Sequence, residues 1–308
     1  MFSFTKKQKG HRLTALISGT DGTACASLSN PRADQPVLEQ GGLYAVNPGE
    51  APADSLQRLV RKLSLGSDSF TTLLPIGDYH LMMVEAPEVP PSELKAAVRW
   101  RIRDLIDFHI DDAVLDVFDA PPSGARGVQE SIYVVVARNS TVKSLIEPFE
   151  SAGIELGVID IPELAMRNIA ARLDTDKEGV ALLHFEEDHV LVTLTRDATL
   201  YLARSMDFGY TQLQESPELV DRIALELQRS MDYYDRHFQQ APIRSVALCP
   251  VPVDLPGLAS SLGEQTGLPV QSLDIGDIVK IGDAVEQDQL ARCTLAIGAA
   301  LRTETTQL

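Results

Sequence analysis

Positive charge is scarce in this sequence. Lysine and arginine together number 27 against 44 aspartates and glutamates, which gives a formal net charge of −17. A surface this acidic repels a phosphate backbone, and the basic residues are scattered apart from two small groups. The composition therefore argues against nucleic acid as a partner.

Long apolar runs are also missing. The longest, such as Tyr133 to Ala137, fall far short of the roughly 20 residues that a membrane span needs. Near the N-terminus Lys6, Lys7 and Lys9 are not followed by the apolar segment of a secretory signal. We therefore expect a cytoplasmic protein without a membrane span.

Cysteine and histidine are few. The three cysteines, Cys25, Cys249 and Cys293, stand in apolar stretches without metal-like spacing, so we expect buried free thiols. His184 and His189 bracket the acidic turn 186–188, which can be interpreted as a metal cluster or as a solvated turn between strands. We favour the solvated turn and expect no metal site.

The longest amphipathic stretch runs from Pro217 to Phe238. Its apolar residues recur at intervals of three and four, which places them on one face of a helix: Leu219, Ile223, Leu227, Met231, Tyr234 and Phe238. Pro217 suits the first helical position, with Ser216 as its cap. With 308 residues and 44% hydrophobic content, the chain is long enough for two domains with cores of their own.

The remaining periodic segments alternate strands with helices, which indicates an α/β fold. The first part of the chain predicts a hairpin, a strand, a helix and two further strands: 13–28, 43–46, 53–63, 71–76 and 79–86. A helix over 92–108 follows, with Leu94, Val98, Ile102, Leu105 and Ile106 on its buried face. The second part predicts three strands before the long helix, at 180–185, 190–195 and 199–204.

The segment Leu225 to Tyr234, LELQRSMDYY, resembles the corresponding helix of type IV pilus assembly proteins of the PilM kind. The similarity extends from about Leu13 to Arg302, and within the family it is strongest to the branch that serves the mannose-sensitive haemagglutinin (MSHA) pilus. This resemblance implies an actin-like, ribonuclease-H-like fold of two similar halves, 1–176 and 177–308. It also implies a small α+β subdomain inserted at 87–152 and a C-terminal helix at 293–302 that returns to the first half.

Relatives of this fold bind ATP between the halves, but the phosphate loops are altered here. The first loop ends in Ser18-Gly19, which keeps a glycine and lacks the carboxylate. Where the second loop should be Asp-x-Gly, the chain has His184-Phe185-Glu186, which puts a charged side chain where backbone should approach phosphate. The third loop, 249–252, has two prolines in place of a glycine pair. We predict a pseudo-ATPase without catalytic residues, which binds ATP weakly or not at all and has no other cofactor.

A remnant of the nucleotide site is nevertheless predicted. Glu226 and Arg229 on the long helix have the spacing with which relatives hold adenosine, and Gly19 and Gly209 complete the set. The alternative for Glu226 and Arg229 is an i, i+3 ion pair on a solvated helix face, which is a common arrangement.

A partner surface is predicted on the helix after Pro91. Lys95, Arg99 and Arg103 form a basic stripe at four-residue intervals, while Trp100, the only tryptophan, points to another side. An exposed tryptophan near cations is a plausible anchor for a partner. The alternative is that the stripe pairs with nearby aspartates such as Asp104 and that Trp100 packs on the neighbouring half.

The resemblance implies a non-catalytic scaffold, cytoplasmic and peripheral at the inner membrane. Such a protein binds the cytoplasmic N-terminus of a PilN-like single-span inner-membrane protein and links it to the pilus motor ATPase. Two alternatives remain open: an ATP-binding actin-like pilus assembly ATPase, and the cytoplasmic component of a type II secretion system.

Overall fold

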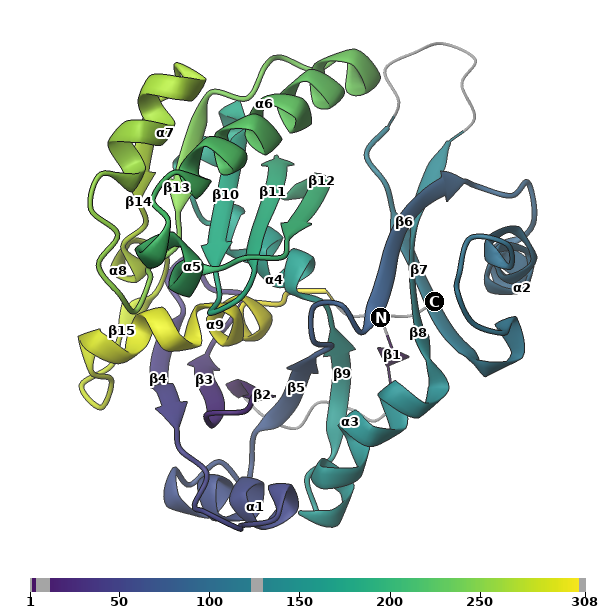
Figure 1. Cartoon of the computed structure of the whole chain (residues 1–308). Coiled ribbons are helices and arrows are strands. Elements are labelled where there is room, and N and C mark those ends of the chain that lie inside the picture. Colours follow the sequence, from purple (N-terminus) through teal and green to yellow (C-terminus); the bar gives the residue numbers. More distant parts are fainter. Residues whose placement is uncertain (1, 4–11, 123–129, 305–308) are drawn as a thin grey trace.

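The computed structural model describes residues 2–3, 12–122 and 130–304. Two β-sheets lie one above the other with two helices between them, and a third, smaller sheet stands to one side (Figure 1). No helix within these ranges is long and apolar enough to cross a bilayer.

The first sheet is built mainly from the N-terminal part of the chain. Its strand order is β1-β9-β5-β2-β3-β4-β15. The strands are β1 Phe2–Ser3, β2 Arg12–Ser18, β3 Thr23–Ser29, β4 Val37–Tyr44, β5 Ser69–Leu73, β9 Leu156–Asp160 and β15 Lys280–Ile281. The predicted hairpin is confirmed, since β2 and β3 pair antiparallel along their whole length. The helices α1 (Pro52–Lys62) and α3 (Asn139–Ser151) pack together on one face.

Strand β4 lies earlier in the sequence than predicted. The sequence analysis placed a strand at 43–46 after a glycine turn, but Gly41 and Gly42 lie inside β4. Gly42 has a φ of +147°, and a Cβ there would stand 3.2 Å from the side chain of Gln289. The glycine therefore admits the 3₁₀ helix η3 (Gln287–Cys293) beside the strand.

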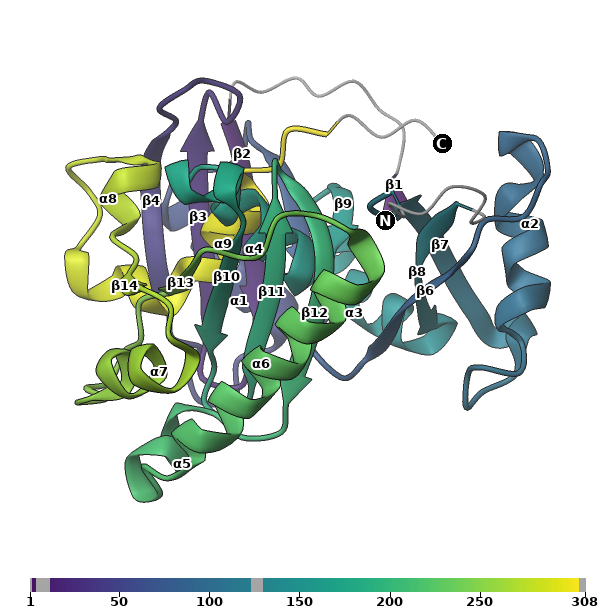
Figure 2. The same cartoon turned by 90° about the horizontal axis from the view of Figure 1, so that it is seen from above.

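The second sheet has the order β12-β11-β10-β13-β14. Its strands are β10 Val180–Phe185, β11 Val190–Arg196, β12 Thr199–Met206, β13 Ser245–Leu248 and β14 Val270–Ser272. Its outer face is covered by α6 (Leu219–Phe238) and α7 (Leu258–Thr266), as Figure 2 shows. The predicted inner face of α6 is buried at Ile223, Leu227, Tyr234 and Phe238.

The start of α6 differs from the prediction. The helix begins at Leu219 rather than Pro217, and no side chain caps it. A separate short helix, α5 (Tyr210–Glu215), precedes it and was not predicted. Backbone amides of Leu219 and Val220 bond to the carbonyls of Ser216 and Pro217, so a tight turn stands where the first helical turn was expected.

Two helices fill the space between the large sheets. The helix α4 (Pro162–Ala170) packs on the second sheet, and α9 (Thr294–Ala300) packs on the first. They cross closely, because a Cβ added to Gly298 would lie 2.4 Å from the backbone oxygen of Ala165. Small residues thus bring the two halves together through one helix pair. The remaining short elements are η1 Ile110–Asp112, η2 Asp174–Glu178 and α8 Ile275–Ile278.

The third sheet has the order β6-β8-β7, with β6 Tyr79–Glu85, β7 Ala113–Asp119 and β8 Ser131–Arg138. Strand β6 pairs with β8 along its whole length, so this sheet begins at Tyr79 rather than at the predicted boundary of 87. Helix α3, predicted inside the subdomain, packs on α1 and on the strands β7 and β8 of the third sheet, in a core cluster that also includes residues of the first sheet. The predicted range therefore omits one strand of the third sheet, and its helix α3 lies between that sheet and α1 of the first half.

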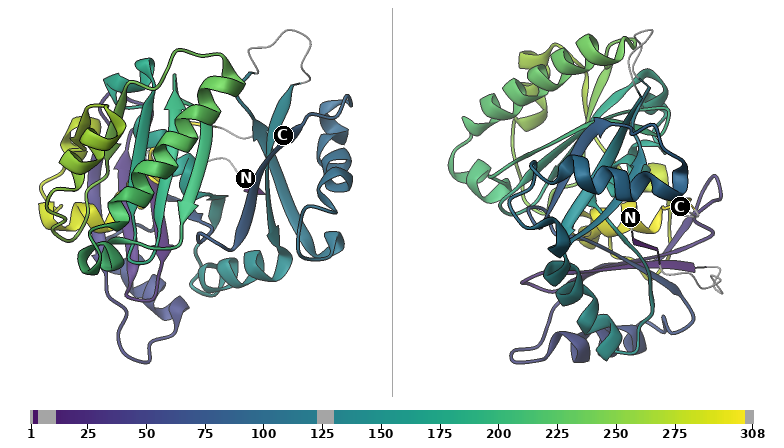
Figure 3. Two further views of the ribbon diagram at one scale, coloured as in Figure 1. Left: turned by 45° about the horizontal axis from the view of Figure 1, so that its top comes forward. Right: turned by 90° about the vertical axis from the view of Figure 1, so that its right-hand side faces the viewer.

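The helix α2 (Pro91–Ile102) covers one face of the third sheet. It faces the viewer in the right-hand view of Figure 3. Its Val98 and Ile102 are buried as predicted. The helix ends at Ile102 rather than at 108, and Leu105, predicted to be buried, is 60% exposed. Because the chain turns after Ile102, Leu105 does not lie on the buried helical face where it was predicted.

Candidate functional site: the cleft between the halves

A cleft of about 480 Å³ lies between the β2–β3 turn of the first half and the β10–β11 turn of the second. The first half contributes residues on and beside its turn: Ile17, 19–22, Ala24 and Leu43. The second half contributes 184–188, 210–212 and Pro252, with 291–292 and 294–296 from η3 and α9. The cleft lies between the two halves, where relatives of this fold bind a nucleotide and where a remnant site was predicted.

The β10–β11 turn is held rigidly. The backbone amide of Glu186 donates to the carbonyl of His189 at 2.8 Å, and the amide of Tyr210 donates to the carbonyl of Glu186 at 2.9 Å. A Cβ on Gly209 would lie 2.2 Å from the Glu186 oxygen. Gly209, predicted as a remnant nucleotide residue, therefore lets the start of α5 pack on this turn, because any side chain would push them apart.

Negative charge dominates the cleft. Asp21, Glu186, Glu187 and Asp188 line it, whereas Arg292 is the single Lys or Arg among its described lining residues. Burial raises the pKa of the Glu186 carboxyl above its usual value. Because like charges repel strongly where water is partly excluded, this lining favours cations over phosphates.

His184 is the buried member of the lining. Its side chain is 5% exposed, and Nδ1 has no hydrogen-bond partner among the described residues. Its Nε2 lies 3.9 Å from Oε1 of Glu186. Burial lowers the pKa of His184 to about 4, so the ring is neutral at pH 7. The cleft thus carries a neutral ring beside the carboxylate of Glu186.

The predicted remnant nucleotide residues are not brought together. Gly19 lines the cleft. Glu226 and Arg229 lie outside its described lining and bond to each other, with 2.7 Å between Oε1 and Nη1. Arg229 is 61% exposed. The pair therefore has the geometry of the alternative interpretation, an ion pair on a solvated helix face.

Lys95 and Arg99, predicted to contact a partner, bond within the chain. Nζ of Lys95 lies 2.9 Å from Oδ1 of the buried Asp116. The guanidinium of Arg99 donates to the carbonyls of Ile110 and Ala113 at 2.6 and 3.1 Å. These two side chains therefore tie α2 to β7 and to the turn before it.

Trp100 and Arg103 are exposed to solvent. Trp100 is 70% exposed, which confirms that it points away from the buried face. Arg103 is 54% exposed and pairs with the neighbouring Asp104, at 3.0 Å between Nε and Oδ1. Together with Leu105 they leave an exposed apolar and basic region at the C-terminal end of α2.

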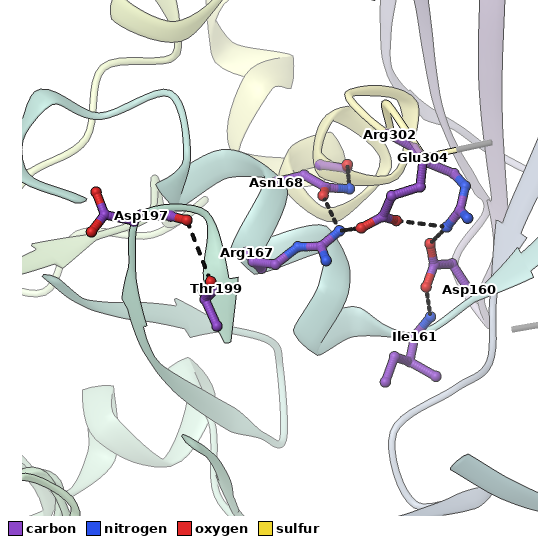
Figure 4. A network of polar contacts seen from close by, with 9 residues as sticks. Asp160, Ile161, Arg167, Asn168, Asp197, Thr199, Arg302 and Glu304 are labelled. Atoms are coloured by element: carbon purple, nitrogen blue, oxygen red, sulfur yellow. Dashed lines mark hydrogen bonds and ion pairs between the residues drawn. The ribbon is translucent and has the colours of Figure 1, made fainter. Parts of the chain in front are cut away.

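The sequence analysis missed a buried ion pair behind the cleft. Nη1 of Arg302, after α9, donates to Oδ2 of Asp160 at the end of β9, and both side chains are at most 3% exposed. Glu304 accepts bonds from both Arg302 and Arg167 (Figure 4). The pair spans the fold between residues far apart in the chain, so no local pattern indicates it.

A second buried acid was also missed. Tyr79 donates its hydroxyl to Oε2 of Glu163 at the start of α4. Burial raises the pKa of Glu163 to about 6 and that of Tyr79 well above its usual value. Glu163 thus contrasts with Asp160, because its partner is a neutral phenol rather than a guanidinium.

No family model and no curated protein matches the sequence. Solved structures do match. A chain of the PilM–PilN type IV pilus biogenesis complex matches with 20% sequence identity and a TM-score of 0.76. The match covers 95% of the present chain and 98% of the matched chain. The cytoplasmic domain of EpsL, an inner-membrane component of the Vibrio cholerae type II secretion system, is 14% identical over 95% and 96%, with a TM-score of 0.50. A Bacteroides thetaiotaomicron protein with an actin-like ATPase fold and unknown function is 12% identical over 93% and 96%, with a TM-score of 0.50. This chain therefore has the actin-like ATPase fold.

Proposed function

We propose that this chain is a non-catalytic, MshI-like scaffold of type IV (MSHA-type) pilus assembly. In this proposal it is cytoplasmic and peripheral at the inner membrane. It binds the cytoplasmic N-terminus of a PilN-like single-span protein and links that protein to the motor ATPase. The observation that carries the proposal is the structural likeness to the PilM–PilN complex along nearly the whole chain.

We assign the partner contact to the C-terminal end of α2. Lys95 and Arg99 bond within the insertion, so their role is to hold the helix in place. Trp100 and Arg103 remain exposed, and an exposed tryptophan beside a cation suits an anchor for a peptide that is disordered when free. Of the four residues predicted to contact the partner, Lys95 and Arg99 therefore support the helix. Trp100 and Arg103 make the contact.

The absence of ATPase activity is the second part of the proposal. The resemblance aligns His184 and Glu186 with the second phosphate loop of relatives. In this structure both residues line the cleft, together with acidic residues of both halves. Calorimetry with Mg-ATP tests this: we expect no binding or a millimolar dissociation constant. A low-micromolar constant, about −8 kcal/mol, would instead support the alternative of an ATP-binding assembly ATPase.

The partner contact is tested with a synthetic peptide of the cytoplasmic N-terminal segment of a PilN-like single-span protein. We expect Trp100→Ala to weaken binding of the full chain at least tenfold, since anchoring aromatics carry much of the affinity of such contacts. We expect Arg103→Glu to slow association and reduce its salt dependence.

Two variants on α6 serve as matched controls. Leu225→Ala removes another exposed apolar side chain, and Arg229→Glu reverses another exposed, locally paired arginine. Both should leave peptide affinity unchanged. If the α6 variants weaken binding as much as the α2 variants, or if neither α2 variant weakens it, the assignment to α2 is wrong.

The likeness to the EpsL cytoplasmic domain keeps a type II secretion role as the second candidate. Capture of membrane partners with the tagged full chain separates the two. A pilus protein among the captured partners supports the proposal, and a secretion-system protein alone supports the second candidate.

A further inference from the structure

The β10–β11 turn brings three side chains of metal-ligating type together. Glu186, Asp188 and His189 each offer one ligand atom, and these atoms all lie within 4.8 Å of one another. Two atoms bound to one ion at about 2.0–2.2 Å lie at most about 4.4 Å apart, so small side-chain rotations complete the set. We propose that this turn binds a divalent transition-metal ion through these three side chains, without a nucleotide.

The ligand types select the class of metal. Mg²⁺ and Ca²⁺ prefer sites made of oxygen atoms alone. An imidazole nitrogen with two carboxylates suits Zn²⁺ or Mn²⁺ instead, and three protein ligands leave positions for water. The proposed ion is therefore Zn²⁺ or Mn²⁺.

The backbone holds the ligands in position before any ion arrives. The amide of Glu186 bonds to the carbonyl of His189, which fixes the two ends of the turn relative to each other. Gly209 and Tyr210 pack against the turn, and the amide of Tyr210 donates a hydrogen bond to the carbonyl of Glu186. Ligands on a rigid element lose little conformational freedom on binding, which favours affinity.

The surroundings of His189 fit a ligand histidine. Its Nδ1 lies 2.8 Å from Oδ1 of Asp188, inside the cluster, while Nε2 lies 3.9 Å from Oδ1 of Asp207. A histidine that binds metal through one nitrogen commonly directs the other N–H to a carboxylate. Asp207, which is 98% exposed, lies near that nitrogen and would need to move closer to accept this hydrogen bond.

His184 provides an independent indication. It is 5% exposed, its Nδ1 has no partner among the described residues, and its Nε2 faces the carboxylate of Glu186 at 3.9 Å. A buried polar atom without a partner is unfavourable, and the ring nevertheless lies with Nε2 towards the Glu186 carboxylate. Carboxylates that bind metals are usually hydrogen-bonded by a second group, and His184 lies beside Glu186 to serve as that group.

The location suggests what the ion does. Asp21 of the first half lines the same cleft as Glu186, Glu187 and Asp188 of the second. A divalent cation on the turn offsets the mutual repulsion of these carboxylates.

The test is a titration of the full chain with MnCl₂ and, separately, ZnCl₂, followed by calorimetry. We expect micromolar dissociation constants, with MgCl₂ at least tenfold weaker than MnCl₂. Glu186→Gln, Asp188→Asn and His189→Gln should each weaken binding at least tenfold. The matched control is Glu187→Gln, which removes the same charge from the same turn but lies outside the three-residue cluster, and it should change the constant less than threefold.

Three results would overturn the proposal. These are dissociation constants above a millimolar for both ions, a Glu187→Gln effect as large as that of Glu186→Gln, or a His189→Gln variant that binds normally. The second of these would mean general attraction to an acidic surface. Thermal unfolding without metal checks that each variant is folded. Spin-echo spectroscopy of bound Mn²⁺ should show an imidazole nitrogen in the wild type and in Glu187→Gln, and its absence in the wild type also refutes the site.

Discussion

The two halves meet in two ways, on a sealed side and on an open side. On the sealed side, α4 and α9 cross with Gly298 against the backbone of Ala165, and Arg302 pairs with Asp160 out of contact with water. On the open side, the two turns that face the cleft carry carboxylates and are separated by a hollow.

The difference concerns charge as much as packing. Asp160 on the sealed side is paired and buried, whereas the acids of the open side outnumber the single arginine beside them. Close packing makes the sealed side sensitive to each added or removed atom, while solvent screens changes on the open side. Substitutions at equivalent places on the two sides should therefore differ greatly in their effect on stability.

The largest effect is expected for Arg302→Met. This change leaves Asp160 charged and buried without its main partner, and breaking a buried pair in this way costs about 3–5 kcal/mol. Urea denaturation measures the loss. The double variant Asp160→Asn with Arg302→Met should recover much of it, because it removes the charge but keeps the bond from the Ile161 amide. A double variant as unstable as Arg302→Met would contradict this account.

A smaller effect is expected for Gly298→Ala. The new Cβ would stand 2.4 Å from the Ala165 oxygen, so α4 and α9 must separate, and overpacking of this kind costs roughly 1–3 kcal/mol. Gly19→Ala on the open side is the control. Its Cβ would meet only an ordinary contact with Asp21 at 3.5 Å, and we expect a change within about 0.5 kcal/mol. Equal denaturation midpoints for the two variants would remove the distinction between the sides.

The buried carboxyl of Glu163, on the sealed side, should make the free energy of unfolding depend on pH. Its pKa is about 6 in the folded protein and near 4.5 when unfolded, so the folded state holds the proton more tightly. Its contribution to stability is present below pH 4.5 and is lost as the pH rises through 6, by about 2 kcal/mol for a shift of this size. Glu163→Gln should therefore raise the free energy of unfolding at pH 8 by about 1–2 kcal/mol and change it little at pH 4. Equal gains at both pH values would exclude titration of Glu163 as the cause.

The smallest effect is expected for Asp21→Asn on the open side. Removing one of several facing carboxylates relieves repulsion, which should stabilise the protein by at most about 0.5 kcal/mol at low salt. The gain should disappear in 1 M NaCl, because salt screens exposed charges. Thermal unfolding at the two salt concentrations measures it, and a loss of stability at low salt would show that Asp21 makes a favourable contact.

Features that depend on neighbours three or four residues away could be predicted from the sequence. The buried face of α6 follows from the spacing of Ile223, Leu227, Tyr234 and Phe238, and the exposure of Trp100 follows from the phase of α2. The β2–β3 hairpin follows from a glycine turn between two strands. The altered phosphate loops, with Glu186 at one of them, stay a prediction from the resemblance.

Local patterns failed where a distant segment decides the outcome. The assignment of β6 to the third sheet depends on its pairing with β8, and Gly209 is required because of a turn formed by residues 186–188. Helix α2 showed a basic stripe, but the direction of Lys95 and Arg99 depends on Asp116 and on the carbonyls of Ile110 and Ala113.

The sequence by itself determined the α/β pattern and the helix faces, since each depends on residue types a few positions apart. Only the tertiary structure decided which charges are paired. It joined Arg302 to Asp160 across the fold, left Nδ1 of His184 without a hydrogen-bond partner among the described residues, and brought acidic residues of both halves to one cleft. The physical reason is that electrostatic energy depends on distance and burial, and both are properties of the folded chain.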